Sequence, residues 1–542
     1  MKLNSASIKN GNTWKEKGYV IPSFDRDKMI KETVAEPEWV HFGAGNIFRA
    51  FQANLSQRML EEGFSTKGLT VVEGFDYEII EKMYRPHDNL SILVTLKADG
   101  SVDKTVIESI AESCILDSEN EKEFARLKEI FTKDSLKMAT FTITEKGYCL
   151  TNAGGETLPP VAADFEEGPV KPKSYIGKVA ALLYERFLSG KKPIAMVSTD
   201  NCSHNGDKLY DAIHAFADNW AKNGKADKDF VAYIEDESKV SFPWSMIDKI
   251  TPRPDDSVND ILKNDGVEEL EAVVTSKNTW VAPFVNAEES EYLVIEDKFP
   301  NGRPALEKVG VIFTTKETVD KVERMKVCTC LNPLHTSLAV FGCILGYDKI
   351  SEEMKDEDLV KLIEQIGYVE GLPVVTDPGV IKPQEFIDTV VNVRIPNKFM
   401  PDTPQRIACD TSQKLPIRFG ETIKAYIGSD NLDVQNLKCI PLVFAGWLRY
   451  LMGVEDNGLI FEPSPDPLLT KCQEYVKDIK LGGEADKEEI KAKILPLLKD
   501  EKIFGVDLEK EGLADKVINY YMSMIQDKGA VRKTLHETVC AL

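Results

Sequence analysis

The sequence has few of the residue patterns that mark metal sites or disulfide frameworks. Its six histidines include no His-Glu-x-x-His or His-x-His spacing, and its ten cysteines include no Cys-x-x-Cys pair. Catalytic and structural zinc sites usually depend on such spacings, and disulfide frameworks are typical of small secreted domains. We therefore expect no metal cofactor, and we expect reduced cysteines in a cytoplasmic protein.

Basic residues are also in the minority, and long apolar runs are missing. The chain carries a formal net charge of −22, which argues against nucleic acid or an anionic membrane as a partner. The first twenty residues contain no apolar core typical of a secretory signal. Residues 439–451 are apolar but include Arg449 and are too short to span a bilayer. The expected partner is a small molecule, bound by a monomer or a weak homo-oligomer.

The length of 542 residues favours two or three domains. Residues 1–36 are polar and suggest an N-terminal extension. Residues 37–308 alternate predicted strands with predicted helices, which indicates a parallel sheet covered by helices on both faces. From residue 309 to 542 long helical patterns dominate. The sequence thus predicts an α/β fold, with a Rossmann-like doubly wound domain followed by a mainly helical domain.

Individual elements follow from apolar periodicity. Strands are expected at 39–42, 69–73, 90–96, 138–144 and 193–198. Helices are expected between them at 46–62, 121–131 and 176–188. In the second domain helices are expected at 319–345, 356–370, 437–452 and 487–498.

A glycine-rich turn follows the first buried strand. Gly43 and Gly45 match the first two glycines of a dinucleotide-binding turn, and Asn46 begins the next helix. The third glycine is absent, because Phe48 stands at its position and Arg49 follows. Asp76, after the second strand, has the position of an acid that accepts hydrogen bonds from an adenosine ribose, which favours NAD over NADP. The alternatives are a plain strand–helix turn and a helix-capping role for Asp76.

The segment from Lys326 to His335, KVCTCLNPLH, resembles the signature of the long-chain mannitol dehydrogenase family. That family includes reductases of fructuronate and tagaturonate. Other segments agree with the family in the same order, from about residue 38 to 425. They are the glycine turn, Thr142–Tyr148, Asp200–Asn201 with His204–Gly206, Phe242–Pro252, Ile295–Pro304 and Arg406–Lys414.

The chemistry of a ketone reduction suits these residues. Hydride transfer builds negative charge on the carbonyl oxygen, which needs hydrogen-bond donors and finally a proton. Lys326 is the candidate general acid–base, and the amides of Asn201 and Asn332 are candidate donors to the oxygen. His335 is expected to orient the lysine or the substrate. The resemblance implies these same roles. It further implies proton exchange with solvent at Glu145 and a supporting place, or a helix cap, for Asp248, while His41 and His204 are expected to be structural.

One departure concerns the spacing of the signature. The family places four residues between its lysine and asparagine, whereas this chain has five between Lys326 and Asn332. An extra residue turns a regular helix by about 100°. A single π-turn absorbs such an insertion, and we predict one here. Pro333 is also unusual, and because proline disfavours helix at the preceding residue, a helix start or kink is expected at Asn332.

Three cations suggest the substrate. Arg406, Lys414 and Arg418 fall in a region that lines the substrate in the family, and the resemblance links an arginine at 418 to the uronate reductases. An arginine can bind a carboxylate through two hydrogen bonds. The alternative is that Arg418 pairs with Glu421. The expected reaction is the reversible, NAD-dependent reduction of D-fructuronate to D-mannonate. Tagaturonate reductase, mannitol 2-dehydrogenase and a non-catalytic relative that binds a sugar acid and NADH remain alternatives.

Overall fold

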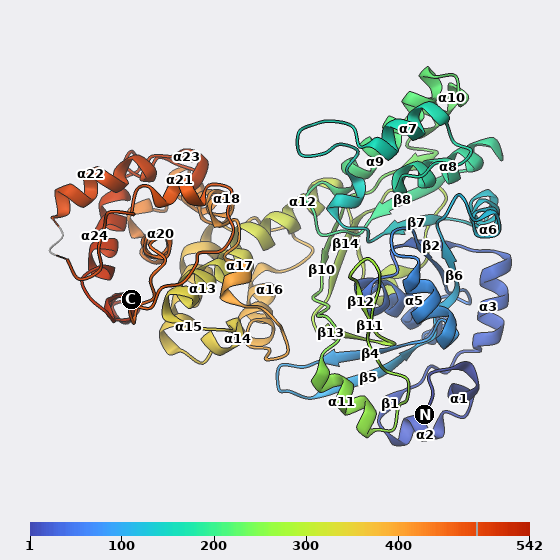
Figure 1. Ribbon diagram of the computed structural model, residues 1–542, viewed down its shortest axis with the longest axis horizontal. Coiled ribbons are helices and arrows are strands. Elements are labelled where there is room, and N and C mark those ends of the chain that lie inside the picture. The colour runs from blue at the N-terminus through green and yellow to red at the C-terminus, as the bar shows by residue number, and fades with distance from the viewer. Residues whose placement is uncertain (484–485) are drawn as a thin grey trace. The chain divides into compact units, whose positions relative to one another are not determined.

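A computed structural model describes residues 1–483 and 486–542. The chain forms two compact units, coloured blue to green and yellow to red in Figure 1. Unit 1 comprises Met1–Lys97 and Ser101–Asp320, and unit 2 comprises Ala98–Gly100 and Lys321–Leu542. Residues 1–36, predicted as an extension, therefore belong to unit 1. Residues 484–485, within the predicted helical domain, lie outside the described residues.

A six-stranded parallel sheet forms the centre of unit 1. Starting from β2, the chain adds β3 and β6 on one side of the sheet. It then returns to the centre and adds β7, β8 and β9 on the other side, so the strand order reverses between β2 and β7. This order is that of a doubly wound dinucleotide-binding fold, so the predicted fold class is confirmed. The strands, in spatial order, are β6 (Ile110–Ile115), β3 (Leu69–Glu73), β2 (Trp39–Phe42), β7 (Met138–Phe141), β8 (Ile194–Ser198) and β9 (Val240–Ser241).

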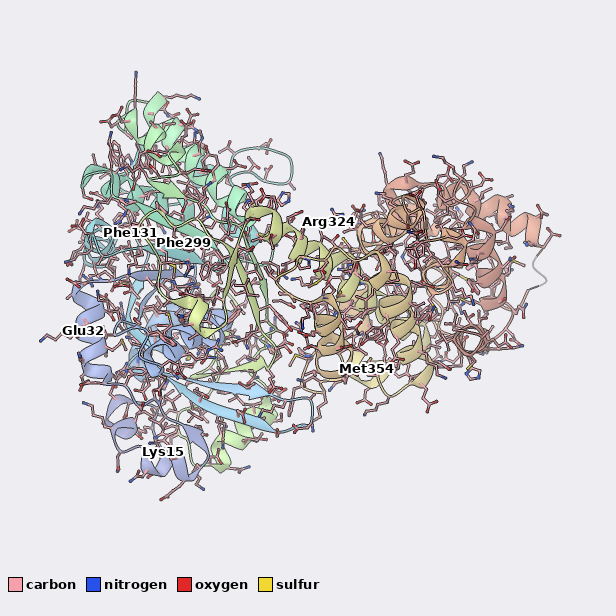
Figure 2. The ribbon with its side chains drawn as sticks, turned by 180° about the vertical axis from the view of Figure 1, so that it is seen from behind. Lys15, Glu32, Phe131, Phe299, Arg324 and Met354 are labelled. Carbon is pink, nitrogen blue, oxygen red and sulfur yellow. The ribbon has the colours of Figure 1, made fainter. Side chains whose placement is uncertain are left out.

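Both faces of this sheet are buried. Successive side chains along a strand point to opposite faces, so a strand that is buried at every position contributes to a core on each side. In β8, Ile194 and Met196 belong to one hydrophobic core, and Ala195 and Val197 belong to the other. Phe131, labelled in Figure 2, lies in the first core. The helices of unit 1 are α1 (Ser5–Lys9), α2 (Asn12–Glu16), α3 (Arg26–Ala35), α4 (Asn46–Ala50), α5 (Gln52–Glu61), α6 (Glu121–Thr132), α7 (Pro159–Glu167), α8 (Tyr175–Leu188), α9 (Asn205–Lys222), α10 (Asp229–Glu235) and α11 (Asp256–Asn264), with shorter turns η1 (Ile80–Tyr84), η2 (Arg85–His87), η3 (Glu145–Tyr148) and η4 (Leu306–Val309).

Some predicted elements differ from the structure. The strand expected at 90–96 exists as β4 (Ser91–Leu96), but it lies outside the parallel sheet and pairs with two other strands. The strand expected at 138–144 ends at Phe141, because the next residues form a loop held by the half-buried Asp200. The helix expected at 46–62 is divided at Phe51, whose φ of −120° departs from helical geometry.

Three smaller sheets complete unit 1. In the first, β1 pairs in parallel with β5, β5 pairs antiparallel with β4, and β4 pairs in parallel with β13. The second places β14 between an antiparallel β10 and a parallel β15, and the third is the antiparallel pair of β11 and β12. These strands are β1 (Tyr19–Val20), β5 (Val102–Ile107), β13 (Phe284–Glu288), β10 (Ser245–Asp248), β14 (Tyr292–Glu296), β15 (Ile312–Thr314), β11 (Val273–Val274) and β12 (Trp280–Val281).

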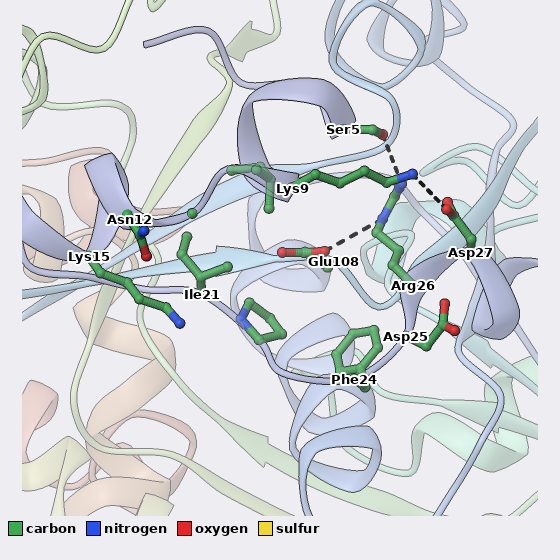
Figure 3. Close-up of a pocket in the computed structure, with 13 residues that line it drawn as sticks. Ser5, Lys9, Asn12, Lys15, Ile21, Phe24, Asp25, Arg26, Asp27 and Glu108 are labelled. Carbon is green, nitrogen blue, oxygen red and sulfur yellow. Dashed lines mark hydrogen bonds and ion pairs between the residues drawn. The ribbon is translucent and has the colours of Figure 1, made fainter.

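The N-terminal residues enclose a pocket of about 330 Å³ against the body of unit 1 (Figure 3). Arg26 donates to Ser5 Oγ at 3.0 Å, and its Nε lies 4.0 Å from Glu108 Oε2. Glu108 is 5% exposed. Burial raises the pKa of Glu108 to about 7, although the nearby Arg26 lowers it and Glu61 raises it further. The N-terminal residues thus contact the rest of unit 1 at the buried carboxyl group of Glu108, whose ion pair with Arg26 is long.

Unit 2 is helical, as predicted, and its described residues contain one isolated bridge, between Val454 and Ile460, but no named strand. Several of its helices include π-helical turns. The elements are α12 (Lys316–Met325, which begins in unit 1), η5 (Lys326–Cys330), α13 (Asn332–Leu345), α14 (Ile350–Glu353), α15 (Glu357–Glu364), η6 (Gln365–Gly371), η7 (Leu372–Val374), α16 (Pro383–Thr389), η8 (Val390–Arg394), α17 (Pro404–Ile407), α18 (Thr411–Leu415), η9 (Pro416–Gly420), α19 (Glu421–Ile427), η10 (Val434–Asn436), α20 (Cys439–Leu451), α21 (Leu469–Gln473), α22 (Lys487–Leu498), α23 (Glu501–Phe504), α24 (Ala514–Met524) and α25 (Ala530–Cys540).

One helical run among the described residues, Lys316–Leu345, is long and apolar enough to cross a membrane by length and composition. In this fold 78% of its apolar window is buried. Such burial is what a core helix of a folded domain shows, so the run is weak evidence for a membrane span.

Candidate active site

The predicted site residues of unit 1 follow the carboxyl ends of the central strands. The glycine turn follows β2, Asp76 follows β3, Glu145 follows β7, and Asn201 follows β8. Carboxyl ends of parallel strands lie at one edge of a sheet, and ligands of doubly wound folds bind at this edge where the strand order reverses. The strand order reverses between β2 and β7, so the predicted residues surround the expected ligand position.

The two glycines of the turn have different roles. Gly43 has a φ of +109°, and a Cβ there would lie 2.2 Å from the carbonyl oxygen of Thr142, so the protein's own packing requires glycine. A Cβ at Gly45 would meet nothing within 4 Å. Gly45 leaves this space open at the start of α4, where a pyrophosphate is expected to approach the backbone. The open space fits the prediction that the turn binds a dinucleotide.

Glu73, at the end of β3, connects the glycine turn to the loop that follows this strand. Its carboxylate accepts hydrogen bonds from the backbone N–H groups of Ala44 at 2.8 Å, Phe75 at 2.8 Å and Asp76 at 3.0 Å. Burial raises the pKa of Glu73, while these hydrogen bonds act in the opposite direction. The sequence prediction missed this residue. An acid at the last position of an otherwise apolar strand was the available clue.

Asp76 is buried, and only one of its oxygens is bonded. Its Oδ2 accepts a hydrogen bond from Thr275 Oγ1 at 2.5 Å. Its Oδ1 is buried and has no hydrogen-bond partner among the described residues. Buried acceptors are normally satisfied, so a missing donor is expected at this position. A ribose hydroxyl would supply one, which fits the predicted role, whereas a helix cap would use a backbone N–H.

The other predicted cofactor residues support the turn from within the protein. Arg49 is buried and donates to the carbonyl oxygen of Ala282 at 2.6 Å and to Asn46 Oδ1 at 2.9 Å. Phe48 is fully buried and stacks on His41, with ring centroids 4.4 Å apart. Burial lowers the pKa of His41 to about 3, so this histidine is neutral at physiological pH. The expectation that His41 is structural agrees with this environment.

A half-buried aspartate shapes the loop that carries Glu145. Asp200 accepts hydrogen bonds from the backbone N–H groups of Ile143 at 2.9 Å and Thr144 at 2.8 Å, and from the Tyr148 hydroxyl at 2.5 Å. Burial raises the pKa of Asp200. Thr144 has a φ of +63°, an uncommon value for a β-branched residue. The aspartate holds this strained turn in place, a role that the sequence prediction did not assign.

Glu145 and Asn201 are both exposed. The Glu145 side chain is 62% exposed and pairs with Lys208 at 2.5 Å. Asn201 directly follows the half-buried Asp200. Asp248 is buried at the end of β10; because it lies in a strand, the alternative of a helix cap is wrong for this residue.

In unit 2 the predicted π-turn is confirmed. Residues Lys326–Cys330 form a π-helix between α12 and α13, and the backbone N–H of Leu331 donates to the carbonyl oxygen of Lys326 at 3.1 Å. That bond spans five residues instead of four, so one extra residue is accommodated without rotating the two flanks. Lys326 is buried. Asn332 is the first residue of α13, so the helix start predicted from Pro333 is also confirmed.

Arg418 lies beside the first turn of α13. Its Nη1 donates to Thr336 Oγ1 at 2.5 Å, and that hydroxyl donates to the carbonyl oxygen of Asn332 at 2.9 Å. His335 is the neighbour of Thr336 and is half-buried. Burial lowers the pKa of Arg418 to about 10. Two successive hydrogen bonds, through the Thr336 hydroxyl, therefore connect Arg418, a predicted substrate residue, with Asn332, a predicted catalytic residue.

The alternative partner of Arg418 is bound elsewhere. Glu421 pairs with Arg324 at 3.0 Å and with Lys424 at 2.9 Å; Arg324 is labelled in Figure 2. In the part of the chain that the structure describes, no carboxylate pairs with Arg418. The half-buried guanidinium thus lacks a protein counter-charge.

The other two predicted cations have protein partners. Lys414 donates to the carbonyl oxygens of Ile407, at 3.0 Å, and Cys409. Burial lowers the pKa of Lys414, and the charge of Arg418 lowers it further. Arg406 is exposed and forms an ion pair with Asp402. The structure therefore associates Lys414 with Arg418, whereas Arg406 is neutralised by its neighbour.

Comparisons with known proteins agree with this geometry. The family model of the mannitol dehydrogenase Rossmann domain matches residues 37–308, and that of the mannitol dehydrogenase C-terminal domain matches residues 318–525. A D-mannonate oxidoreductase of Thermotoga maritima is 52% identical over 541 residues, covering 99% of both chains.

Two solved structures share the fold. Mannitol 2-dehydrogenase of Pseudomonas fluorescens, solved as a ternary complex with NAD and D-mannitol, is 27% identical, covers 100% of each chain and gives a TM-score of 0.68. A substrate-free D-sorbitol dehydrogenase at 24% identity covers 95% of this chain and 97% of its own, with a TM-score of 0.77, and shows likeness of fold alone. The family models together span most of the sequence, and the chain belongs to the mannitol dehydrogenase family.

Proposed function

We propose that the protein is an NAD-dependent oxidoreductase that reduces the ketone of D-fructuronate to the secondary alcohol of D-mannonate, reversibly. Membership of the mannitol dehydrogenase family supports oxidation and reduction of a CH–OH group. The full-length similarity to a protein named D-mannonate oxidoreductase supports a sugar acid as the substrate. All ten cysteines are free thiols, and we place the enzyme in the cytoplasm.

The residues of unit 1 fit NAD. Gly45 leaves room for a pyrophosphate at the start of α4, and Asp76 presents a buried oxygen that needs a donor. A carboxylate beside the ribose also repels a 2′-phosphate, which disfavours NADP. NADH, when bound, supplies the hydride. Glu73 and Arg49 do not need to touch it, because both act by fixing the backbone of the turn.

The proton chemistry is assigned to side chains that can hold or release a proton. Lys326, buried in the π-turn, donates a proton to the new alkoxide during reduction and accepts it back in the reverse reaction. Asn332, close to Lys326 in the sequence, is the proposed hydrogen-bond donor to this oxygen as its charge develops, and the Asn201 amide is proposed for the same role. His335 orients the substrate, Asp248 supports it, and the exposed Glu145 exchanges the proton with solvent.

The observation that carries the substrate choice is Arg418. A half-buried guanidinium without a carboxylate partner among the described residues lies one hydrogen bond from Thr336, next to the catalytic turn. An arginine in such a place is suited to a substrate carboxylate. Lys414 adds positive charge. A neutral polyol would leave this cation without a counter-charge, which disfavours mannitol 2-dehydrogenase.

The test compares turnover of a uronate and a neutral ketose. Arg418→Met should raise KM for fructuronate about 10- to 100-fold, because a hydrogen bond to a charged group contributes about 1.5–3 kcal/mol. The kcat/KM for fructose should change little. Lys424→Met removes an exposed lysine from the next helix and serves as the control for loss of positive charge. Equal losses for both ketones would contradict the carboxylate role.

The alternatives give different results in the same assay. Faster reduction of tagaturonate than of fructuronate would identify the enzyme as a tagaturonate reductase. Tryptophan fluorescence that reports NADH binding, without NADH oxidation by any of the ketones, would identify a non-catalytic relative. Full wild-type turnover by Lys326→Ala would remove the lysine from the mechanism.

A further inference from the structure

Three metal-ligating side chains lie together in unit 2, apart from the residues given a catalytic role. Asp358 is near the start of α15, and His536 and Cys540 are four residues apart on α25. Their ligand atoms all lie within 4.8 Å of one another. His536 Nδ1 is 2.9 Å from Asp358 Oδ1, and Cys540 Sγ is 3.8 Å from each ring nitrogen of His536. We propose that these residues form a site for a zinc-type divalent cation.

The distances agree with tetrahedral geometry. With Zn–S near 2.3 Å and Zn–N near 2.0 Å, sulfur and nitrogen ligands are separated by roughly 3.5 Å, and nitrogen and oxygen ligands by roughly 3.4 Å. The sulfur–nitrogen separation of 3.8 Å is longer than this value by about 0.3 Å, and the nitrogen–oxygen separation of 2.9 Å is shorter by about 0.5 Å. Small side-chain rotations bring the three donors onto one ion, with water as the fourth ligand.

The neighbouring charges favour one arrangement of the carboxylate. Arg532 Nη1 lies 2.5 Å from Asp356 Oδ2 and 3.8 Å from Asp358 Oδ2. The guanidinium thus faces one oxygen of Asp358 and leaves Oδ1 directed at His536. Second-sphere partners of this kind fix the orientation of metal ligands. The His536 side chain is 61% exposed, so an ion can enter from solvent.

The donor set selects the metal. A thiol, an imidazole and a carboxylate together suit zinc better than calcium or magnesium, which prefer oxygen ligands only. On binding, Cys540 loses its S–H proton to solvent and binds as thiolate, while His536 binds as neutral imidazole. One thiolate and one carboxylate then balance the two positive charges of the ion. The sequence expectation of no zinc site considered histidine pairs and cysteine pairs, whereas this set combines a His-x-x-x-Cys pair with an aspartate 178 residues from the histidine.

The consequence of the site is structural. The ion joins α15 to α25 and so fixes the last helix of the chain to the body of unit 2. Because no proposed catalytic residue is a ligand, the rate of NADH oxidation should not depend on it.

Zinc titration of the full-length, chelator-treated protein against a colorimetric zinc indicator of micromolar affinity tests the site. The wild type should bind one equivalent of Zn²⁺ that Cys540→Ser and His536→Ala each lose, and Co²⁺ should give a thiolate charge-transfer band that Cys540→Ser abolishes. Cys149→Ser, which changes an exposed cysteine of unit 1, is the matched control and should keep both. Zinc should raise the melting temperature of the wild type and of Cys149→Ser only.

Two outcomes would overturn the site. One is the same zinc stoichiometry in the wild type, Cys540→Ser and His536→Ala. The other is binding to the wild type so weak that the indicator retains all the zinc. Both measurements are made without substrate or NADH, so they are independent of the proposed reaction.

Discussion

The extra residue in the π-turn permits a direct test of how Lys326 is placed. The Leu331 N–H donates to the Lys326 carbonyl oxygen at 3.1 Å, a π-type bond that can accommodate one extra residue without changing the register of the flanking helices. Deletion of the half-buried Cys328 should therefore convert the π-turn into an ordinary helical turn with four intervening residues. Lys326 should keep its direction relative to Asn332, and kcat for ketone reduction should stay within about tenfold of wild type.

Insertion of a residue in the same turn is the opposite change to the deletion of Cys328. An alanine added after Cys328 introduces a second extra residue, which turns Lys326 by about 100° relative to Asn332. Since a positioned general acid contributes about 10²–10⁴-fold to rate, kcat should fall by at least about 10²-fold. Steady-state NADH oxidation, with circular dichroism melting to confirm folding, measures both variants. A folded deletion variant as inactive as the insertion variant would refute the idea that the π-turn only preserves the register.

Two further predictions concern buried carboxyl groups in unit 1. Glu73→Gln replaces one acceptor oxygen by an amide donor facing a backbone N–H, so it should destabilise the protein by about 2 kcal/mol and raise KM for NADH more than it lowers kcat; unchanged melting temperature and KM would contradict this role. Glu108 has a folded pKa raised to about 7 against an ordinary value of 4.5, so stability should be full below pH 4.5 and fall by up to about 3 kcal/mol as the pH rises through 7. Glu108→Gln should flatten the difference between urea unfolding at pH 5 and pH 8, and an identical pH dependence in both proteins would show that this carboxyl is not responsible.

The sequence predicted those features that depend only on residues close together along the chain. The apolar runs of β2, β3 and β8 are placed correctly because strands buried on both faces have few polar positions. The π-turn was predictable because a one-residue change in spacing has few structural solutions. The start of α13 followed from the backbone restrictions that Pro333 imposes on Asn332.

Long-range pairing was not predictable in this way. The apolar pattern of β4 is the same whether it joins the parallel sheet or pairs with β13, which lies about 190 residues further along the chain. Glu73 links its own loop to the N–H of Ala44, 29 residues away, and Asp200 binds the N–H groups of Ile143 and Thr144, more than 50 residues away. No spacing in the sequence records these contacts. All three cations near residue 410 were predicted to bind the substrate, but Arg406 forms an ion pair with Asp402, four residues before it.

The short pairing of β1 with β5 has a practical consequence for handling the protein. Tyr19 and Val20 lie in register with Lys104 and Thr105, and so cover the outer side of β5. Removal of the first twenty residues, by proteolysis or by a shortened expression clone, would leave the N–H and C=O groups along that side without partners. Uncovered strands of this kind recruit strands from other molecules, so trimmed preparations should self-associate while intact ones stay dispersed.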